Sequence, residues 1–551
     1  MDPEKWRDCL WIALGEVLVV LVLRPFQNTP FVDDWTYGWS VEWLLRHAEL
    51  KILEWSSHLN VVQVLWGALF CLPAGFSFTA LRVSTWVLAV ACLWGVYWLL
   101  RELRVSRQGA LLGTATLGVN PIFFMLSFTF MTDVPFLALM VWASFAMVRA
   151  VCTERTGWLL AATILACLAI GVRLVGVAIP AAMAVVLLLH TGGWGRGKGR
   201  VWLTVLPLIF LGGLLWWGAE HLHHTADVSQ LKDAPVNRVQ NLRYALPLLP
   251  RTLVRGTAFV IGAVGLNLLP LSIACLRKDL GRRAAVSAFV LGFFLLALPL
   301  TSPTSIPLLS EGSTWAFSEL GATEPLVAGF QPPGFPLWWR AAVTFAAWGS
   351  AAILFAALCF SSPGKAFLGW LTLGHFLLML MLWLFYDRYT LVALPSAIGL
   401  LLAGGVSPRP TLVLVCAALF GGLSFVGVHD HLQYNRALWQ AVDALRQRGV
   451  PDSDIDGGYV VNGWLHYAHP ENAPRDAQGN ILVPGLTTKI NPLRYQIANR
   501  PSPARRLVTT IPYRRWLGRS GTIYILERET TPPSVRAGGD PGRTHTSVGD
   551  E

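Results

Sequence analysis

The stretch TPFVDDWTYGWSVEWLL, Thr29–Leu45, directly follows the first long apolar run of the chain, residues 9–25. It places two adjacent carboxylates, Asp33 and Asp34, among tryptophan, tyrosine and phenylalanine side chains. Aromatic residues collect where a membrane meets water, and ionisable groups near membrane depth are costly and usually functional. The two aspartates are therefore the first candidates for a functional site.

The composition indicates a membrane protein. The 551 residues are 54% hydrophobic and 14% charged, with a mean hydropathy of +0.51, and this balance is too apolar for a soluble chain. The net charge is +11, but the basic residues stand in short clusters between apolar runs. Cytoplasmic loops of membrane proteins have this pattern, so we expect no nucleic-acid partner.

About thirteen apolar runs approach the length of a membrane-spanning helix, which is roughly 17–25 residues. They lie near residues 9–25, 79–100, 108–124, 134–150, 157–171, 174–190, 201–219, 252–275, 284–300, 338–360, 366–385, 389–404 and 410–428. The shorter run Leu59–Pro73 either crosses the membrane or lies along its surface. If it does not cross, the densest basic loops face the cytoplasm, as lysine and arginine prefer. We therefore interpret residues 59–73 as an interfacial helix.

This topology predicts an all-α polytopic membrane protein with a small C-terminal α/β domain outside the cytoplasm. Residues 1–428 form the transmembrane domain, and its first outer loop carries interfacial helices at 27–78. Residues 429–530 are richer in charge and contain the turn signal PDSDIDGG and the strand-like run GTIYILER, which is typical of a small mixed domain. Residues 531–551 are expected to form a flexible tail.

Further polar residues fall on the same predicted face as Asp33. Asp133 follows the third span, Arg173 lies in the turn GVRLVG, and Asp387 and Arg388 lie in the turn FYDRY. Carboxylates and arginines gathered at one membrane surface can bind a lipid headgroup and perform acid–base chemistry on it.

Simpler roles remain open for these residues. Asp33 or Asp34 could cap the helix that we expect to begin at Trp35, because aspartate is a favoured N-cap residue. Arg173 could extend to a lipid phosphate. The segment EHLHHTAD, Glu220–Asp227, has histidines whose spacing suits no single helix or strand face, so we interpret it as a loop and expect no metal site.

Three stretches of the chain resemble a known family. VDDWTYGWSVEWLL, VLWGALFCLPAGFSFTALRVS and NPIFFMLSFTFMTDVPFLALM resemble the N-terminal half of the GT-C membrane glycosyltransferases. The nearest branch is the bacterial one related to the lipid A aminoarabinose transferase and the protein O-mannosyltransferases. DRYTLVALP, Asp387–Pro395, resembles a late Arg-Tyr…Pro signature of that branch. The resemblance covers roughly residues 30–150, 160–180 and 385–400, and it implies a GT-C fold.

The resemblance also implies roles for individual residues. Asp33 falls on the family's catalytic base, Asp34 is its neighbour, and Asp133 is the second acidic residue of the site. Arg173 falls where the family often has a cation near the lipid phosphate. The motif reads Asp-Asp where close relatives often have Asp-Glu, a change that keeps both carboxylates.

The substrate-binding residues implied by the resemblance include three more positions. Arg388 and Tyr389 fall on the late Arg-Tyr pair. His58 lies in HLNVV, where the family commonly has HPPL, and this departure leaves the role of His58 open.

The implied activity is transfer of a hexose or pentose from a polyprenyl-phosphate donor to a hydroxyl of a lipid, glycan or protein acceptor. A base must take the hydroxyl proton, and cations must stabilise the leaving phosphate. Fixed arginines can do this, so we expect no cofactor, and a single displacement would invert the anomeric centre. We expect the protein in the bacterial inner membrane, with the site and the C-terminal domain on the periplasmic side.

Two other classes of function remain as alternatives. A transporter or lipid flippase would favour polar residues near mid-membrane and paired half-repeats, whereas the acidic residues here cluster at loops on one side. An O-antigen ligase or polymerase is also a multispan protein. Such a protein usually depends on one large loop late in the chain, and we find no comparable loop in this sequence.

Overall fold

The computed structural model describes residues 3–56, 59–189, 198–223, 257, 260–275, 282, 284–289, 292, 327–328, 337–357, 362–380, 387–404, 408–475, 493–516 and 520–528. The longer helices are α1 (Pro3–Leu23), α2 (Asp34–His47), α3 (Val61–Cys71), α4 (Phe78–Glu102), α5 (Arg107–Gly118), α7 (Asp133–Thr153), α8 (Thr156–Ile170), α9 (Ala178–Leu189), α11 (Leu206–His221), α17 (Leu337–Ala357), α18 (Pro363–Leu380), α19 (Leu394–Ala403) and α20 (Pro410–Arg446).

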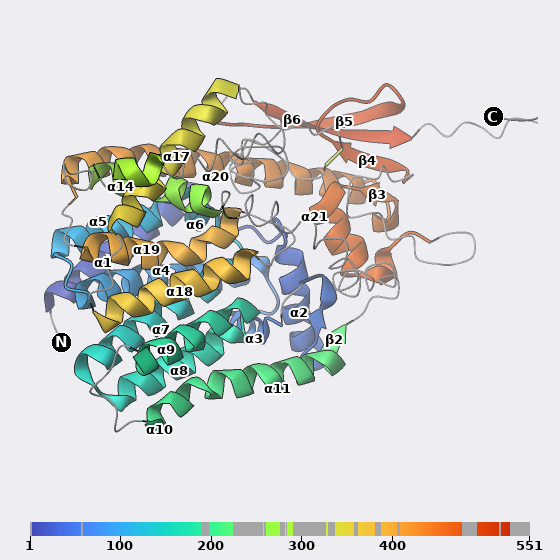
Figure 1. The fold of residues 1–551 in the computed structure, drawn as a ribbon. Helices are drawn as coiled ribbons and strands as arrows, with labels where there is room; N and C mark the ends of the chain where they lie inside the picture. Colours follow the sequence, from blue (N-terminus) through green and yellow to red (C-terminus); the bar gives the residue numbers. More distant parts are fainter. Residues whose placement is uncertain are drawn as a thin grey trace, which may run out of the picture.

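The shorter helical segments are η1 (Glu54–Ser56), α6 (Pro121–Leu126), η2 (Leu174–Val177), α10 (Lys198–Val201), η3 (Trp202–Thr204), α14 (Leu269–Ala274), η6 (Asp387–Ala393), η7 (Asp452–Asp454), α21 (Gly458–Asn462), η8 (Gly463–Tyr467) and η9 (Pro470–Asn472). Figure 1 shows the long helices running side by side across the molecule, with α2, α21 and the strands gathered at one end. We call this the site end of the bundle.

Four helices of the described part of the chain are long and apolar enough to cross a membrane: Phe78–Glu102, Asp133–Thr153, Trp202–Ala219 and Pro410–Arg446. Large apolar side chains are also exposed along other helices, for example Leu18 of α1. A surface of this kind is typical of lipid contact, so the helices support membrane association. The expected total of about thirteen spans stays a prediction.

The run that we interpreted as interfacial forms α3. Its 11 residues extend about 16 Å at 1.5 Å per residue, whereas the hydrocarbon core of a bilayer is about 30 Å thick. Leu65, Leu69 and Leu72 are exposed on one side, while the opposite side is buried. This length and this apolar face support a helix that lies along the membrane surface.

The apolar run at 108–124 is not one continuous helix, because two helices meet there. α5 ends at Gly118, and the side chain of Asn120 accepts hydrogen bonds from the amides of Ile122 and Phe123 at 3.0 and 3.1 Å. Pro121 follows at the first helical position, where its missing N–H costs nothing. An asparagine cap followed by proline therefore begins a new helix, α6.

A small sheet forms the C-terminal unit. Its strands are β3 (Ile455–Asp456), β4 (Tyr495–Ala498), β5 (Arg505–Tyr513) and β6 (Gly521–Arg528), in the order β3-β4-β6-β5. β6 pairs antiparallel with both neighbours, and β3 pairs parallel with β4. The strand predicted from GTIYILER is β6, so that prediction is confirmed. A separate two-residue pairing joins β1 (Ile52–Leu53) to β2 (Leu222–His223).

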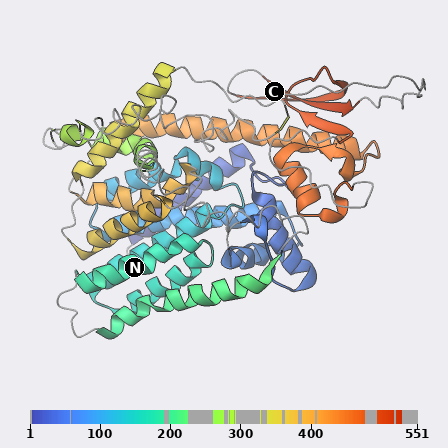
Figure 2. The same ribbon diagram turned by 45° about the vertical axis from the view of Figure 1, so that its right-hand side comes forward.

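The boundary that we placed after residue 428 falls inside one continuous helix. α20 runs from Pro410 to Arg446, and its second half packs against the sheet through a core that includes Trp439, Leu445 and Ile525. Figure 2 shows α20 passing from the helix bundle to the sheet. The bundle and the C-terminal unit are therefore joined by a rigid element.

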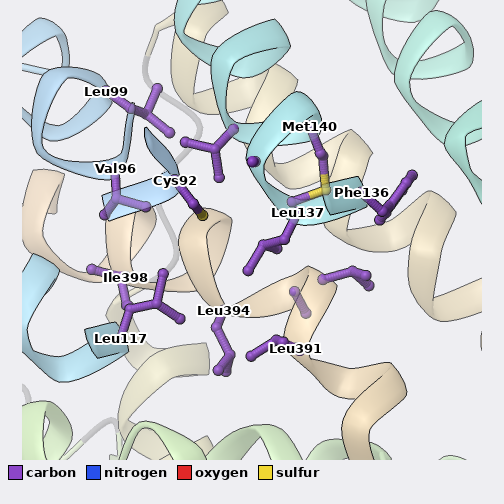
Figure 3. Packing of buried hydrophobic residues seen from close by; sticks show 14 of the residues in the cluster. Cys92, Val96, Leu99, Leu117, Phe136, Leu137, Met140, Leu391, Leu394 and Ile398 are labelled. Atoms are coloured by element: carbon purple, nitrogen blue, oxygen red, sulfur yellow. The ribbon is translucent and has the colours of Figure 1, made fainter. Parts of the chain in front are cut away.

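The apolar core of the bundle fixes the position of η6 and of α19, which follows it. Figure 3 shows Leu391 of η6 and Leu394 of α19 in one cluster with Val96 of α4 and Leu137 of α7. Leu391 and Leu394 are each 1% exposed. Close packing of this kind leaves η6 little freedom, which matters because η6 begins with the predicted site residues.

Candidate active site

The turn that begins α2 sends the two aspartates in different directions. The amide of Asp34 donates to the carbonyl of Phe31, and the amide of Thr36 donates to the carbonyl of Asp33, both at 3.0 Å. Val32 has a φ of 53°, which is strained for a β-branched residue. Asp33 is the N-cap residue, yet its side chain makes no capping bond. The capping interpretation of Asp33 is therefore wrong.

The Asp33 carboxylate is instead held by two groups from distant parts of the chain. The Tyr459 hydroxyl donates to Oδ1 at 2.6 Å, and Nη2 of Arg388 lies 3.4 Å from Oδ2. The side chain of Asp33 remains 20% exposed. It therefore combines fixed orientation with access from outside, as a catalytic carboxylate requires.

A second ion pair lies beside the first. Arg173 forms a salt bridge with Asp133, and both side chains are almost fully buried. The ring of Tyr389 lies 5.2 Å from the Arg173 guanidinium and 5.7 Å from that of Arg388. Tyr389 thus contacts both cations, and the two ion pairs form one cluster.

This cluster contains five residues singled out from the sequence: Asp33, Asp133, Arg173, Arg388 and Tyr389. Arg173 does not extend to solvent, since it is 6% exposed. We call these five residues the paired cluster. α7 supplies Asp133 at its first residue, and η6 begins one residue before Arg388.

Tyr37 lies close to the paired cluster, and the sequence analysis did not identify it. Its side chain is buried, and the charges acting on it are those of Asp33, Arg388, Asp133 and Arg173. Burial and the Asp33 carboxylate raise the pKa of the Tyr37 phenol above its ordinary value, so the hydroxyl keeps its proton and can donate a hydrogen bond. Its position four residues after Asp33, on the same helix face, was an available signal.

Tyr459 was also missed, because it comes from α21 in the C-terminal unit. Its hydroxyl accepts a hydrogen bond from Trp55 Nε1 at 2.8 Å while donating to Asp33. Burial and the nearby carboxylate raise the pKa of Tyr459 well above its usual range, so it acts as a donor. No local pattern pointed to it, since the contact joins residues 426 positions apart.

Asp34 points away from the paired cluster into the packed first loop. Its Oδ2 accepts from Arg82 Nε at 3.1 Å and from Nη2 at 2.9 Å, and its Oδ1 accepts from the amide of Phe130 at 2.7 Å. Arg82 also donates to the carbonyls of Gln27 and Thr29. Both charged side chains are fully buried. Asp34 therefore neither caps α2 nor faces the cluster.

Two earlier candidates lie wholly or partly outside the described residues. His58 is one of them, and residues 224–227 of the EHLHHTAD segment are also outside. The first half of that segment ends α11 at His221 and forms β2 at Leu222–His223, so the interpretation as a loop is wrong there. Within the described ranges, no group of three or more histidine, cysteine, aspartate or glutamate side chains is arranged to hold a metal ion.

The paired cluster can bind an anion next to a carboxylate. It holds two aspartates and two arginines, and Nε of Arg173 is buried without a hydrogen-bond partner in the part of the chain that the structure describes. A buried donor of this kind gains an acceptor when an anionic group enters. Cations shared between carboxylates and an incoming phosphate are able to change partners during a reaction.

Comparison with protein families places part of the chain near membrane glycosyltransferases. Residues 61–217 match the model of a family described as dolichyl-phosphate-mannose-protein mannosyltransferase. The predicted resemblance to such enzymes is confirmed over this segment, which contains Asp133 and Arg173. Asp33, Arg388 and Tyr459 lie outside it. No curated protein matches the chain.

Among solved structures, the chain is similar to ArnT from Cupriavidus metallidurans bound to undecaprenyl phosphate, with 12% identity and a TM-score of 0.41 over 95% of this chain and 98% of that one. It is also similar to the oligosaccharyltransferase of Archaeoglobus fulgidus, with 14% identity and a TM-score of 0.41 over 79% of this chain. The chain spans 57% of the length of that oligosaccharyltransferase.

Proposed function

We propose that the protein is a membrane glycosyltransferase that moves a sugar from a polyprenyl-phosphate donor to an acceptor hydroxyl at the membrane surface. The observation that carries the proposal is the paired cluster: two carboxylate–arginine pairs share Tyr389 at the site end of an apolar helix bundle. The matched family is named for mannosyl transfer from dolichyl phosphate, which is chemistry of the same kind.

In this proposal Asp33 is the general base. It takes the proton of the acceptor hydroxyl while the hydroxyl oxygen attacks the anomeric carbon of the donor sugar. The bond between that carbon and the phosphate oxygen breaks, and polyprenyl phosphate leaves with the bonding electrons. Attack opposite the leaving group inverts the anomeric centre. The hydrogen bond from Tyr459 keeps the Asp33 carboxylate oriented toward the acceptor.

The two arginines stabilise the departing phosphate. Negative charge on the phosphate grows as the sugar leaves, and guanidinium groups fixed in advance favour that state more than the starting one. Arg388 lies beside the base, and Arg173 lies beside Asp133. Entry of the donor phosphate would draw Arg388 partly away from Asp33, which leaves the base freer to accept a proton.

The finer features of the proposal rest on the pattern of basic loops and on the resemblance to the GT-C glycosyltransferases. The basic loops favour a cytoplasmic side opposite the site end, so we propose that the site faces the periplasm of a bacterial inner membrane. The transferred sugar is a hexose or pentose, and the acceptor is a lipid, a glycan or a protein. Asp133 orients the acceptor in this scheme.

The test uses the full chain in detergent with a radiolabelled polyprenyl-phosphate sugar and an envelope extract as acceptor. Asp33→Asn keeps the size of the side chain but cannot accept the proton, so transfer should fall about 100-fold or more, the usual effect of losing a positioned base. Asp443→Asn is the matched control, because Asp443 is a largely exposed carboxylate on α20. Full transfer by Asp33→Asn would refute the assignment.

A further inference from the structure

The segment Arg514–Trp516, which follows β5 and which we call the turn, is bonded to α20 yet leaves a tryptophan half exposed. Trp516 stacks on the ring of His429 with centroids 3.7 Å apart, and it lies 5.7 Å from the ring of Phe425. The amide of Trp516 donates to Asp430 at 2.7 Å. Despite these contacts 52% of Trp516 is exposed. The indole is therefore held in place with one side facing outward.

The exposed apolar side chains of α20 end close to the residues of that helix that contact Trp516. α20 exposes Leu414, Leu419 and Leu423 on its apolar half, and Leu423 is the last exposed large apolar residue of that helix. Phe425 and His429, which contact Trp516, follow within two turns. The turn thus begins where the apolar exposure of α20 ends.

The neighbouring helix α1 marks the same level independently. Its exposed apolar side chains continue to Val22, and the helix ends at Leu23. Leu23 packs in one cluster with Val428 of α20. Arg436, two turns further along α20, donates to the carbonyl of Arg24 at 2.7 Å. Two helices therefore place the edge of the hydrocarbon region next to Trp516.

Two arginines, Arg514 and Arg515, directly precede Trp516 in the chain. Arg514 is exposed, Arg515 is half-buried against Tyr513, and Arg24 is exposed at the end of α1. The Asp430 carboxylate is bonded to His429 and accepts from the amide of Trp516. A tryptophan beside arginines at the edge of an apolar belt suits the headgroup layer of a membrane.

We propose that the segment Arg514–Trp516, which follows β5, is a membrane anchor of the C-terminal unit. The Trp516 indole lies in the headgroup layer, and the two arginines bind the phosphates of anionic phospholipids. The anchor holds the C-terminal unit against the bilayer, and this unit supplies Tyr459 to Asp33. The inference is independent of the reaction proposed above.

The test places a photoreactive p-benzoylphenylalanine at position 516 of the full chain in nanodiscs of phosphatidylglycerol and phosphatidylcholine. Lipid adducts are measured by mass spectrometry. The control position is 507, because Leu507 is 51% exposed on β5, the strand that leads to Arg514–Trp516, and lies about 20 Å from this segment at 3.3 Å per residue. We expect adducts at position 516 in clear excess over position 507, with phosphatidylglycerol preferred.

The arginines are tested in the same experiment. Arg514→Gln should reduce the preference for phosphatidylglycerol about fivefold, since a basic residue near an anionic surface contributes about 1 kcal/mol. If the probe at position 516 prevents folding, judged by thermal unfolding, it is moved to the exposed position 514. Equal adduct yields at the turn and at position 507, or no preference for the anionic lipid, would overturn the proposal.

Discussion

Asp33 and Asp34 are neighbours in the chain, but they belong to two different regions of the molecule. Asp34 is fully buried, and its partners Arg82 and Phe130 come from the N-terminal part of the chain. Asp33 is 20% exposed, and its partners Arg388 and Tyr459 come from the late helices and the C-terminal unit. One carboxylate holds a loop together, while the other lies where three parts of the chain meet.

The difference arises at the start of α2, where Asp33 is the non-helical N-cap residue and Asp34 is the first residue of the helix. One step along the chain therefore separates a side chain in the paired cluster from one in the packed first loop. Removing a carboxylate that is fully paired and buried leaves its partner's charge buried and unpaired, whereas a carboxylate that is partly exposed and loosely paired can change partners. Chemical identity alone does not distinguish the two, but their surroundings do.

The largest expected effect comes from breaking the buried pair. Asp34→Asn leaves the Arg82 guanidinium buried without its carboxylate, which costs about 3–5 kcal/mol in the free energy of unfolding. The measurement is the thermal unfolding midpoint in detergent, with Asp443→Asn as the control. We expect the midpoint to fall sharply while transfer per folded molecule stays near that of the wild type. An unchanged midpoint with lost transfer would mean that Asp34, and not Asp33, is the base.

The next effect concerns the cations of the paired cluster. Arg173→Ala and Arg388→Ala should each weaken use of the donor by about 1.5–3 kcal/mol, as expected when a charge-assisted hydrogen bond is lost. The measurement is the dependence of transfer on donor concentration. Arg173→Lys and Arg388→Lys keep the charge and should recover part of the loss. Unaltered donor dependence in both alanine variants would remove the phosphate-binding role.

The smallest expected effect tests whether the C-terminal unit takes part in the site. Tyr459→Phe keeps the ring that packs against Trp35 but removes the hydroxyl that bonds Asp33. The loss of one hydrogen bond is worth about 0.5–1.5 kcal/mol, so transfer should fall a few-fold to about tenfold. Tyr524→Phe, on β6 of the same unit, serves as the control. Equal transfer by the two variants would limit Tyr459 to packing.

Much of the architecture could be predicted from the sequence because hydropathy is a local property. Long apolar runs predicted helices, and the strand-like run GTIYILER predicted β6, since each pattern depends on residues close together in the chain. The departures from the sequence analysis were also local. Asn120 and Pro121 divide the apolar run at 108–124 into two helices, and the boundary placed after residue 428 falls within the continuous helix α20.

The sequence by itself determined which residue types could form a site: Asp33, Asp133, Arg173, Arg388 and Tyr389 stood out as polar groups in apolar surroundings. Only the tertiary structure decided that these five lie together, that Asp34 turns away to Arg82, and that Tyr459 completes the surroundings of Asp33. The reason is that contacts between residues hundreds of positions apart depend on how the helices pack. Packing is set by the whole core, and no short stretch of sequence contains that information.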